Sequence, residues 1–340
     1  MSKDLTGDLV LLAHGSGGTL SRDLVAQRVL SHIENNTLSR LDDSAVLRAS
    51  GRIAFTTDSY TVDPLVFPGG DIGRLAICGT VNDLAVVGAT PSFISLALII
   101  EEGLSFGLLE TIMDSVRGAC EEAKVEVVTG DTKVVNRGKA DRLFINTAGI
   151  GLVPDDIEVS GHNARPGDRV LLSGTIGDHG VAIMGAREGL SFSSLIKSDC
   201  APLNGLTAAI LDAGGAAVHA MRDPTRGGLA STLNEIAFQS RVTIRVEESC
   251  IPVDASVRAA CEMLGLDPLY VANEGKLVVI VDPEAAPSVL DAMRTHRYGA
   301  SAEDIGEVIE GKPGRVTMKT RVGPTRLVPM LAGELLPRIC

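Results

Sequence analysis

Four acidic motifs in the first half of the chain place aspartates beside apolar runs, at the expected ends of strands or helices. A lone aspartate in such a position is most often a turn or N-cap residue. Several that converge would repel one another and need a neutralising cation. Magnesium suits them, because it takes oxygen ligands and leaves positions for phosphates. The candidate ligands are Asp42, Asp43, Asp58, Asp83 and Asp131, in LDDSAV, TTDSY, VNDLA and TGDTKVV.

Two glycine-rich turns could present backbone amides to a phosphate. They are HGSGG at residues 14–18 and PGGDIG at residues 68–73. Such stretches can equally be plain turns, and each alone is a weak signal. The P-loop pattern GxxxxGK[ST], the dinucleotide pattern GxGxxG and the nucleophile pattern GxSxG do not occur. A nucleotide would therefore have to bind through some other fold.

Three further stretches carry groups suited to phosphate or proton chemistry. Lys133 follows Asp131 by two residues and could contact a phosphate, although a solvated lysine at a strand end is the alternative. Glu274 lies between two apolar runs, as either a paired structural charge or a general base whose pKa depends on partial burial. RDPTRGGL at residues 222–229 begins a helix, so its amides, with Thr225 and Arg226, could hold an anion.

The chain ends in PRIC, so Cys340 carries both a thiol and the terminal carboxylate. No two of the six cysteines are spaced CxxC, which argues against a zinc ribbon or a thioredoxin-type site. Cys78, Cys120 and Cys261 fall in apolar helical patterns and are expected to be small core residues. For Cys340, the alternatives are chance, a disulfide partner, or a reactive thiol on an extended arm.

Composition limits what these groups can do. The chain has 340 residues, 45% of them hydrophobic, with 37 glycines and no tryptophan, which suits an α/β protein with an aliphatic core. A net charge of −12 argues against nucleic-acid binding, which needs a basic face. The start lacks the apolar stretch of a signal peptide, and the longest apolar run, residues 93–100, is too short for a membrane span. We expect a cytoplasmic protein.

Hydrophobic periodicity predicts two α/β units joined by a polar linker at residues 154–168. The first unit has predicted helices at 20–34 and 109–120 and strands at 53–58, 93–100 and 142–153. The second has a strand starting at 169, helices at 228–240, about 252–264 and from 284, a strand at 276–282, and two short strands around 304–320. The predicted domains are 1–155, 156–320 and a flexible tail, 321–340.

The motifs together resemble the HypE family of hydrogenase maturation proteins, in register from His14 to Cys340. They are HGSGG, DDSA, TTDSYTVDPLVFPGGDIG, GTVNDLAVVGA, TGDTKVV, DPTRGG, NEG and PRIC. Several are shared with aminoimidazole ribonucleotide synthetase, selenophosphate synthetase and thiamine-monophosphate kinase. The long TTDSYTVDPLVFPGGDIG run and the terminal cysteine are specific to HypE.

The resemblance implies an α/β, two-domain fold like that of aminoimidazole ribonucleotide synthetase, whose N-terminal domain forms a β-barrel at a homodimer interface. It implies that ATP and Mg²⁺ bind between the domains. The carbamoyltransferase HypF would load a carbamoyl group onto Cys340. The chain would then dehydrate that group to a thiocyanate, and cyanide would pass to iron on the HypC–HypD complex for a [NiFe]-hydrogenase.

The same resemblance assigns roles to individual residues. Cys340 carries the group, Lys133 contacts the transferred phosphate or the amide oxygen, and Glu274 takes an N–H proton. The metal ligands are Asp43, Asp58, Asp83 and Asp131, with Asp42 a weaker candidate. The expected ATP contacts are His14, Gly17, Gly18, Thr57, Asn82, Thr132, Asp223, Thr225 and Arg226.

Two other interpretations compete with this one. A selenophosphate synthetase usually carries a cysteine or selenocysteine beside a lysine near its N-terminus, whereas the first cysteine here is Cys78, within an apolar helix. A non-catalytic subunit could keep the fold and bind nucleotide only for structure. The intact Lys133, Glu274 and all four aspartate motifs argue against such decay.

Overall fold

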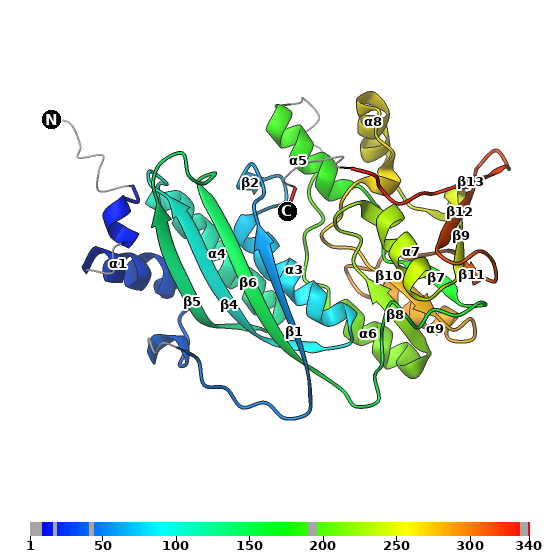
Figure 1. Cartoon of the computed structure of the whole chain (residues 1–340), viewed down its shortest axis with the longest axis horizontal. Helices are drawn as coiled ribbons and strands as arrows, with labels where there is room; N and C mark the ends of the chain where they lie inside the picture. Colours follow the sequence, from blue (N-terminus) through cyan, green and yellow to red (C-terminus); the bar gives the residue numbers. More distant parts are fainter. Residues whose placement is uncertain (1–8, 16–18, 41–43, 190–195, 334–338) are drawn as a thin grey trace.

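The first half of the chain forms a four-stranded sheet in the order β1-β6-β4-β5. The computed structural model describes residues 9–15, 19–40, 44–189, 196–333 and 339–340, and Figure 1 shows this sheet beside the C-terminal half. β4 and β5 are parallel, and the other neighbouring pairs are antiparallel. The bounds are β1 Arg52–Tyr60, β4 Thr90–Glu101, β5 Glu126–Val135 and β6 Leu143–Val153.

Two helices, α3 (Ile72–Val86) and α4 (Phe106–Ala123), cover one face of this sheet. The Asp71 carboxylate caps α3 by accepting hydrogen bonds from the backbone N–H groups of Gly73 and Arg74. The two helices approach closely at Gly73, where a Cβ atom would lie 2.5 Å from the Ile112 carbonyl oxygen. The stretch PGGDIG therefore begins a buried helix.

On the opposite face of the sheet, several apolar side chains are not covered by any of the described residues. Phe55 is 69% exposed and Ile53 is 53% exposed, although both lie in the well-paired strand β1. Ile99 and Leu152 on neighbouring strands are also exposed. β1 and β5 form the two free edges, so the sheet is open in a single chain. An exposed apolar face of this kind is typical of a protein–protein interface.

Short elements precede the sheet and connect its strands. α1, η3 and α2 form the helical segment predicted at residues 20–34, η3 has π-helical geometry, and η2 precedes them in the chain. Their bounds are η2 Leu12–Gly15, α1 Thr19–Leu24, η3 Val25–Leu30, α2 Ser31–Ile33 and η4 Leu38–Arg40, with the hairpin strands β2 Val66–Phe67 and β3 Gly70–Asp71.

The second half forms a seven-stranded sheet in the order β13-β12-β9-β11-β7-β10-β8. Helix α7 contributes to the buried cluster on one side of this sheet, and α6 and α9 to the cluster on the other. Strand β10 (Val278–Val281), which lies between β7 and the edge strand β8, is buried at every residue, which explains its unbroken apolar sequence. The other strands are β7 Arg169–Leu172, β8 Val218–Arg222, β9 Thr243–Glu247, β11 Glu303–Ile309, β12 Arg315–Lys319 and β13 Thr325–Leu327.

The helices of the second half largely match the sequence-based expectation. They are α5 Asp178–Glu188, α6 Asn204–Gly214, α7 Gly228–Gln239, α8 Ala255–Leu264 and α9 Ala286–Thr295, with short turns η5 Gly215–Ala217, η6 Glu248–Cys250 and η7 Pro268–Tyr270. α8 begins at Ala255 rather than at Pro252, because the Asp254 side chain caps it through the backbone N–H of Ser256.

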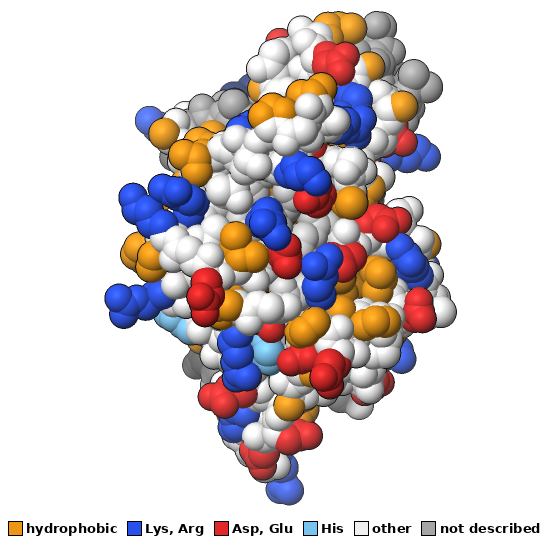
Figure 2. Space-filling view, turned by 90° about the vertical axis from the view of Figure 1, so that its right-hand side faces the viewer, with side chains coloured by type: hydrophobic (Ala, Val, Ile, Leu, Met, Phe, Trp, Pro, Cys, Tyr) orange, Lys and Arg blue, Asp and Glu red, His pale blue; other side chains and the backbone are white. Residues whose placement is uncertain are grey.

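The C-terminal sheet continues past residue 320, where the sequence predicts the tail to begin. β13 pairs with β12, and the Val328 carbonyl accepts a hydrogen bond from the Asn234 amide on α7. None of the helices in the described ranges is long and apolar enough to cross a membrane. Figure 2 shows that acidic and basic side chains are interspersed on the outer face of the C-terminal half.

Candidate functional site

A polar cavity of about 440 Å³ lies where the two halves meet, and we call it the acidic pocket. Its walls come from β1, α3, β8 and the turn after it, α7, the loop before β10, and the last residue of the chain. The lining residues are Thr57, Asp58, Ser59, Tyr60, Gly79, Asp83, Arg222, Asp223, Thr225, Arg226, Thr232, Glu235, Glu274 and Cys340.

Asp58 and Asp83 come from the N-terminal half. The alternation of β1 turns Thr56 and Asp58 toward the helical face of the sheet, and the Thr56 hydroxyl donates a 2.9 Å hydrogen bond to the Asp83 carboxylate on α3. Burial raises the pKa of the Asp83 carboxyl, and the nearby Asp58 raises it further. Two of the predicted aspartates, Asp58 and Asp83, therefore line the same pocket.

The DPTRGG motif forms the turn between β8 and α7. Gly227 and Gly228 both have positive φ angles, and a Cβ atom on Gly228 would lie 2.6 Å from the Leu269 carbonyl oxygen. Glycine is required at Gly228 for both reasons. This tight turn brings Thr225 and Arg226 to the pocket just before the first residues of α7.

Asp223 adds a third buried carboxyl to the pocket. Burial raises its pKa to about 7, with Asp83 as a further cause. Arg222 forms a 2.6 Å ion pair with Glu235, whereas no carboxylate of the described residues lies within ion-pair distance of Arg226. The pocket thus contains more carboxyl groups than cationic groups, and the Arg226 guanidinium is available to bind an anion.

Glu274 is held rigidly by its backbone. Its N–H donates to the Asp199 carboxylate at 3.0 Å, and the N–H of Gly275 donates to the other oxygen of Asp199 at 3.3 Å. Lys276 forms a 3.1 Å ion pair with the same carboxylate. The Glu274 carbonyl accepts from the Asn82 amide at 3.4 Å. These contacts place the glutamate independently of its side chain.

The Glu274 side chain is 3% exposed, and its Oε1 atom has no hydrogen-bond partner among the described residues. Burial raises the pKa of this carboxyl well above its usual value, and the charges of Asp223 and Asp199 raise it further. A buried, unsatisfied oxygen is costly, and in native proteins it often marks a functional group. The raised pKa makes the Glu274 carboxylate a stronger base than an exposed glutamate.

The chain terminus lies in the same pocket. The backbone N–H of Thr61 donates to the terminal carboxylate of Cys340 at 3.1 Å, and the His179 Nε2 atom lies 2.6 Å from the Ile339 carbonyl oxygen. Figure 1 shows the C terminus beside β2, between the two halves. Burial raises the pKa of the Cys340 thiol to about 12, with Glu274 as the next cause. In this position the thiol is neutral.

A second group of predicted residues lies along the β5 edge, away from the acidic pocket. Lys133 and Asp131 form a 3.4 Å ion pair, and both side chains are more than half exposed. Their strand positions pair with Ile99 and Ala97, so they lie on the uncovered face of the sheet. His14 belongs to η2, which packs against β5. Neither Asp131 nor Lys133 lines the acidic pocket of its own chain.

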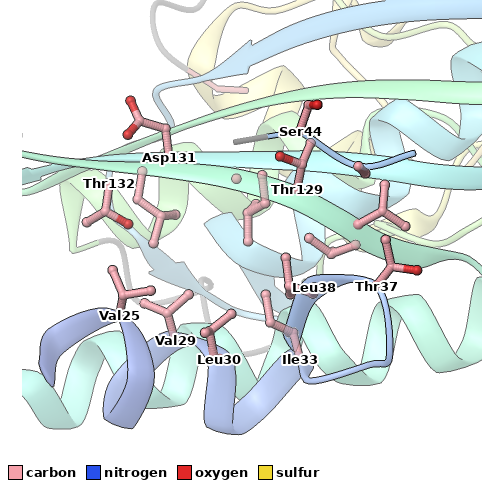
Figure 3. A pocket seen from close by; sticks show the side chains of 16 residues that line it. Val25, Val29, Leu30, Ile33, Thr37, Leu38, Ser44, Thr129, Asp131 and Thr132 are labelled. Carbon is pink, nitrogen blue, oxygen red and sulfur yellow. The ribbon is translucent and has the colours of Figure 1, made fainter. Parts of the chain in front are cut away.

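Thr132 points to the other side of β5, into an apolar cavity of about 280 Å³. Figure 3 shows Val25, Val29 and Ile33 of the helical segment facing the sheet across this cavity, whereas the Asp131 carboxylate points away from the helices. The cavity also has the polar groups Thr37, Ser44 and Thr129 in its lining.

The remaining predicted residues have other settings. Asn82 is fully buried, donates to the Ala201 and Glu274 carbonyls, and accepts from the Leu203 N–H, so it joins the two halves of the molecule. The predictions for Gly17, Gly18, Asp42 and Asp43 fall outside the described residues. Among the residues that the structure describes, no three His, Cys, Asp or Glu side chains converge closely enough to form a metal site.

Sequence reasoning missed several residues that build the site. Arg222, Glu235 and Tyr60 line the pocket. Arg222 and Tyr60 adjoin the motifs RDPTRGG and TTDSY, a signal that could have found them. Asp199 and His179 hold the Glu274 loop and the chain terminus, but each lies in a different part of the sequence from the group it contacts. No local pattern predicts such long-range partners.

Comparisons with known proteins agree with this architecture. The AIR synthase related protein N-terminal domain family matches residues 41–153, and the corresponding C-terminal domain family matches residues 165–319. The carbamoyl dehydratase HypE of Bradyrhizobium diazoefficiens is 53% identical over 338 residues, covering 99% of this chain and 98% of the relative.

Solved structures give the same result. A crystal structure of the hydrogenase maturation protein HypE in complex with ATP has a TM-score of 0.94 and 49% identity, covering 97% of this chain and 99% of that one. HypE in a crystal structure of a HypE–HypF complex has a TM-score of 0.80 and 48% identity, covering 92% of this chain and 100% of that one. With this identity along nearly its whole length and a two-domain fold built around the acidic pocket, the chain belongs to the HypE family of carbamoyl dehydratases.

Proposed function

We propose that this chain uses ATP to dehydrate a carbamoyl group on Cys340 to a thiocyanate, which supplies cyanide for the iron of a [NiFe]-hydrogenase. One observation carries the proposal: the Cys340 thiol lines one pocket together with Asp58, Asp83, Asp223 and Glu274, whose Oε1 atom has no hydrogen-bond partner among the described residues. The position of the thiol beside these carboxyl groups supports its role as the carrier of the reacting group.

The chemistry follows from the poor leaving ability of an amide oxygen. ATP transfers its γ-phosphoryl group to the oxygen of the S-carboxamide, one N–H proton leaves, and ADP departs. The resulting imidate then breaks its C–O bond, losing phosphate and the second N–H proton to give the nitrile carbon of the thiocyanate. The amide oxygen leaves with inorganic phosphate, so atoms balance without an oxidant or reductant. Positioning and charge stabilisation are the main requirements for phosphoryl transfer.

Glu274 is placed to take the N–H protons, because its carboxyl shares the pocket with Cys340 and has an oxygen free of protein partners. Its raised pKa makes the carboxylate a strong base. Arg226 and Thr225, just before α7, are placed to hold phosphate oxygens. The enclosed position of the thiol limits hydrolysis of the activated group by water.

The acidic pocket also suits Mg²⁺ bound with ATP. The support for this is that Asp58, Asp83 and Asp223 all line the pocket and can offer oxygen ligands. Burial raises the pKa values of Asp83 and Asp223, and neighbouring carboxylates raise them further. The three carboxylates do not converge on one point by themselves, but together with the phosphate oxygens of ATP they would supply the oxygen ligands that Mg²⁺ prefers. When bound, the ion would neutralise the developing charge on the phosphates.

Loading requires a different position of the chain terminus. A thiol with a pKa of about 12 is a poor nucleophile at neutral pH, so the carbamoyl group is transferred while Cys340 is outside the pocket. HypF is the proposed donor, consistent with the complex of a HypE relative with HypF. The HypC–HypD complex is the proposed acceptor of the cyanide.

We also propose that the chain works as a homodimer whose sheets close into a barrel. The uncovered face of β1-β6-β4-β5 exposes Phe55, Ile53, Ile99 and Leu152, which a second copy would bury. In a two-fold arrangement, β5 of one copy lies beside β1 of the other. Lys133 would then approach the acidic pocket of the second copy, which accounts for its distance from the pocket of its own chain.

The nucleotide would span both copies in this dimer. Its phosphates would occupy the acidic pocket of one chain, and its base would reach the apolar cavity beside Thr132 of the other. That cavity, with its apolar walls and few polar groups, has the character of a small-molecule site. The two groups of residues predicted from the sequence would thereby form one site.

Mass spectrometry of the C-terminal peptide tests the proposed function. Incubation with HypF, carbamoyl phosphate and ATP is expected to add a carbamoyl group to Cys340, and ATP is expected to convert it to a product lighter by one water. A stable carbamoyl adduct that ATP does not change would refute the dehydration, and an adduct on another cysteine would refute the role of Cys340.

Substitution of the exposed sheet face tests the dimer. Phe55→Asp is expected to shift the protein from dimer to monomer in light scattering and to abolish dehydration, because it places a charge in the interface. Phe238→Asp is the matched control, since Phe238 is 76% exposed on α7 of the other half. A Phe55→Asp protein that remains dimeric, or that is monomeric with full activity, would contradict the proposal.

Mixing two inactive variants tests whether Lys133 acts across the dimer. Lys133→Ala and Glu274→Gln proteins are combined and allowed to exchange subunits, and we expect about one quarter of the wild-type activity to return. Half of the random dimers then contain one chain of each kind, and one of the two sites in such a dimer is complete. Single-turnover assays on pre-carbamoylated protein measure this. If Lys133 and Glu274 act within one chain, the mixture stays inactive.

A further inference from the structure

The last two residues of the chain are held by contacts that do not involve the reactive thiol. The terminal carboxylate of Cys340 accepts hydrogen bonds from the Thr61 backbone N–H at 3.1 Å and from the Thr61 hydroxyl at 3.3 Å. The Ile339 side chain is 6% exposed and belongs to a buried cluster with Ile183, Cys200 and Ala272. The third contact is the 2.6 Å hydrogen bond between the His179 ring and the Ile339 carbonyl.

The hydrogen-bond partners of His179 define its tautomer. A carbonyl oxygen only accepts, so Nε2 of His179 carries the proton that is donated to Ile339. Nδ1 is then the acceptor for the Ser198 hydroxyl, 2.8 Å away. The ring is fully buried and packs edge-on to Phe67. Burial lowers the pKa of His179, which favours this neutral form.

The same short segment holds both the histidine and the Glu274 loop. Ser198 is anchored by its N–H to the Pro68 carbonyl at 2.8 Å, and its hydroxyl accepts the Cys200 N–H at 3.1 Å. The next residue, Asp199, accepts the Glu274 N–H. Residues 198–199 therefore place the chain terminus and the proposed base in one rigid frame.

We propose that His179 is a positioning residue that latches the C-terminal end of the chain into the acidic pocket by holding the Ile339 carbonyl. This inference rests on the proposed function, because it assigns the latch to the step in which the loaded Cys340 is dehydrated. The latch contacts the main chain alone. It therefore holds the terminus whether the sulfur carries a proton, a carbamoyl group or a cyano group. Freeing the terminus for loading requires loss of this hydrogen bond, of the two Thr61 contacts and of the Ile339 packing.

Alkylation of the cysteines measures the latch directly in the full-length protein. Iodoacetamide should modify Cys340 slowly, because its thiol is half-buried and has a raised pKa, and Cys250 is the internal reference because it is exposed. His179→Phe keeps the ring volume but removes the donor, and we expect it to raise the Cys340-to-Cys250 rate ratio about tenfold, equivalent to about 1.4 kcal/mol. His179→Gln retains an N–H donor and is expected to restore most of the protection.

Kinetics separate the latch from a general loss of structure. In single-turnover assays, His179→Phe should slow dehydration of pre-carbamoylated protein about tenfold and leave HypF-dependent loading at the wild-type rate or faster. Ser198→Ala preserves the histidine and should give a smaller change in the same direction, which keeps the test available if His179→Phe does not fold. His162→Gln, at an exposed histidine, is the control and should change neither rate.

Three outcomes would overturn the latch. They are an unchanged alkylation ratio in both His179→Phe and Ser198→Ala, equal effects of Phe and Gln at this position, and slowed loading together with slowed dehydration. Failure of the wild-type protein to dehydrate its carbamoyl adduct would refute the proposed function instead, while the alkylation ratios would still report on the latch.

Discussion

Replacement of Cys340 by alanine is expected to abolish carbamoyl loading and every later step. The proposed carrier of the group is the sulfur atom, whereas the terminal carboxylate of Cys340 and the carbonyl and side chain of Ile339 make the contacts that hold the terminus. The variant should therefore keep the fold and lose the chemistry. Incorporation of carbamoyl label from carbamoyl phosphate, in the presence of HypF and ATP, is the measurement.

The control for this variant is Cys250→Ala, which removes an exposed thiol in η6 and should load normally. The melting temperature of Cys340→Ala should stay close to that of the wild type, because only one sulfur atom is removed from a terminal residue. Carbamoyl label on the Cys340→Ala protein would show that another residue accepts the group and would refute the assignment of Cys340.

Glu274→Gln is expected to load normally but to dehydrate the carbamoyl group about 10²- to 10⁴-fold more slowly, the range usual for loss of a general base. Glutamine has the same shape and cannot accept an amide proton. The backbone contacts of Glu274 with Asp199 and Asn82 do not depend on the side chain. The measurement is a single turnover of pre-carbamoylated protein with ATP, followed by mass spectrometry.

The stability of Glu274→Gln should move in the opposite direction from its activity. The pKa of the Glu274 carboxyl is raised in the folded state, so wild-type stability falls as the pH rises from the unfolded pKa toward the folded one. The glutamine amide does not titrate, so the variant does not lose folding stability in this way as the pH rises. At pH 7 we expect a melting temperature equal to or above that of the wild type.

Glu247→Gln provides the matched control, since that glutamate pairs with Lys319 on the outer strands of the C-terminal sheet. It should dehydrate the carbamoyl group at the wild-type rate. Normal thiocyanate formation by Glu274→Gln would remove Glu274 as the base. A proportional loss of loading and dehydration would point to a damaged fold instead.

The elements that sequence periodicity predicts are those with one clear apolar face. β1, β4, β6, α4 and α7 all lie where the patterns place them, because burial of one face imposes a period of two or 3.6 residues. The start of α3 cannot be predicted from the sequence in this way, because PGGDIG resembles a plain turn. In the structure the helix begins within this stretch, and Gly73 packs against α4.

Asn82 illustrates a limit of assigning function from motifs. It lies next to Asp83 in VNDLA, and the sequence suggests a nucleotide contact for it. In the fold its amide instead joins α3 to the segments at Ala201, Leu203 and Glu274. A buried amide that satisfies distant backbone groups and one that binds a ligand have the same local sequence.

The sequence by itself determined the chemical groups: the aspartate motifs, the DPTRGG turn, Glu274 and the terminal thiol. Their types and immediate neighbours are local properties, and the motifs identified the family from them. Only the tertiary structure decided which groups meet. It joins Asp58, Asp83, Asp223, Glu274 and Cys340 in one pocket, leaves Lys133 on the uncovered sheet face, and adds His179. The reason is physical: burial, pKa and hydrogen-bond partners depend on contacts between segments far apart in the chain, which no short stretch of sequence encodes.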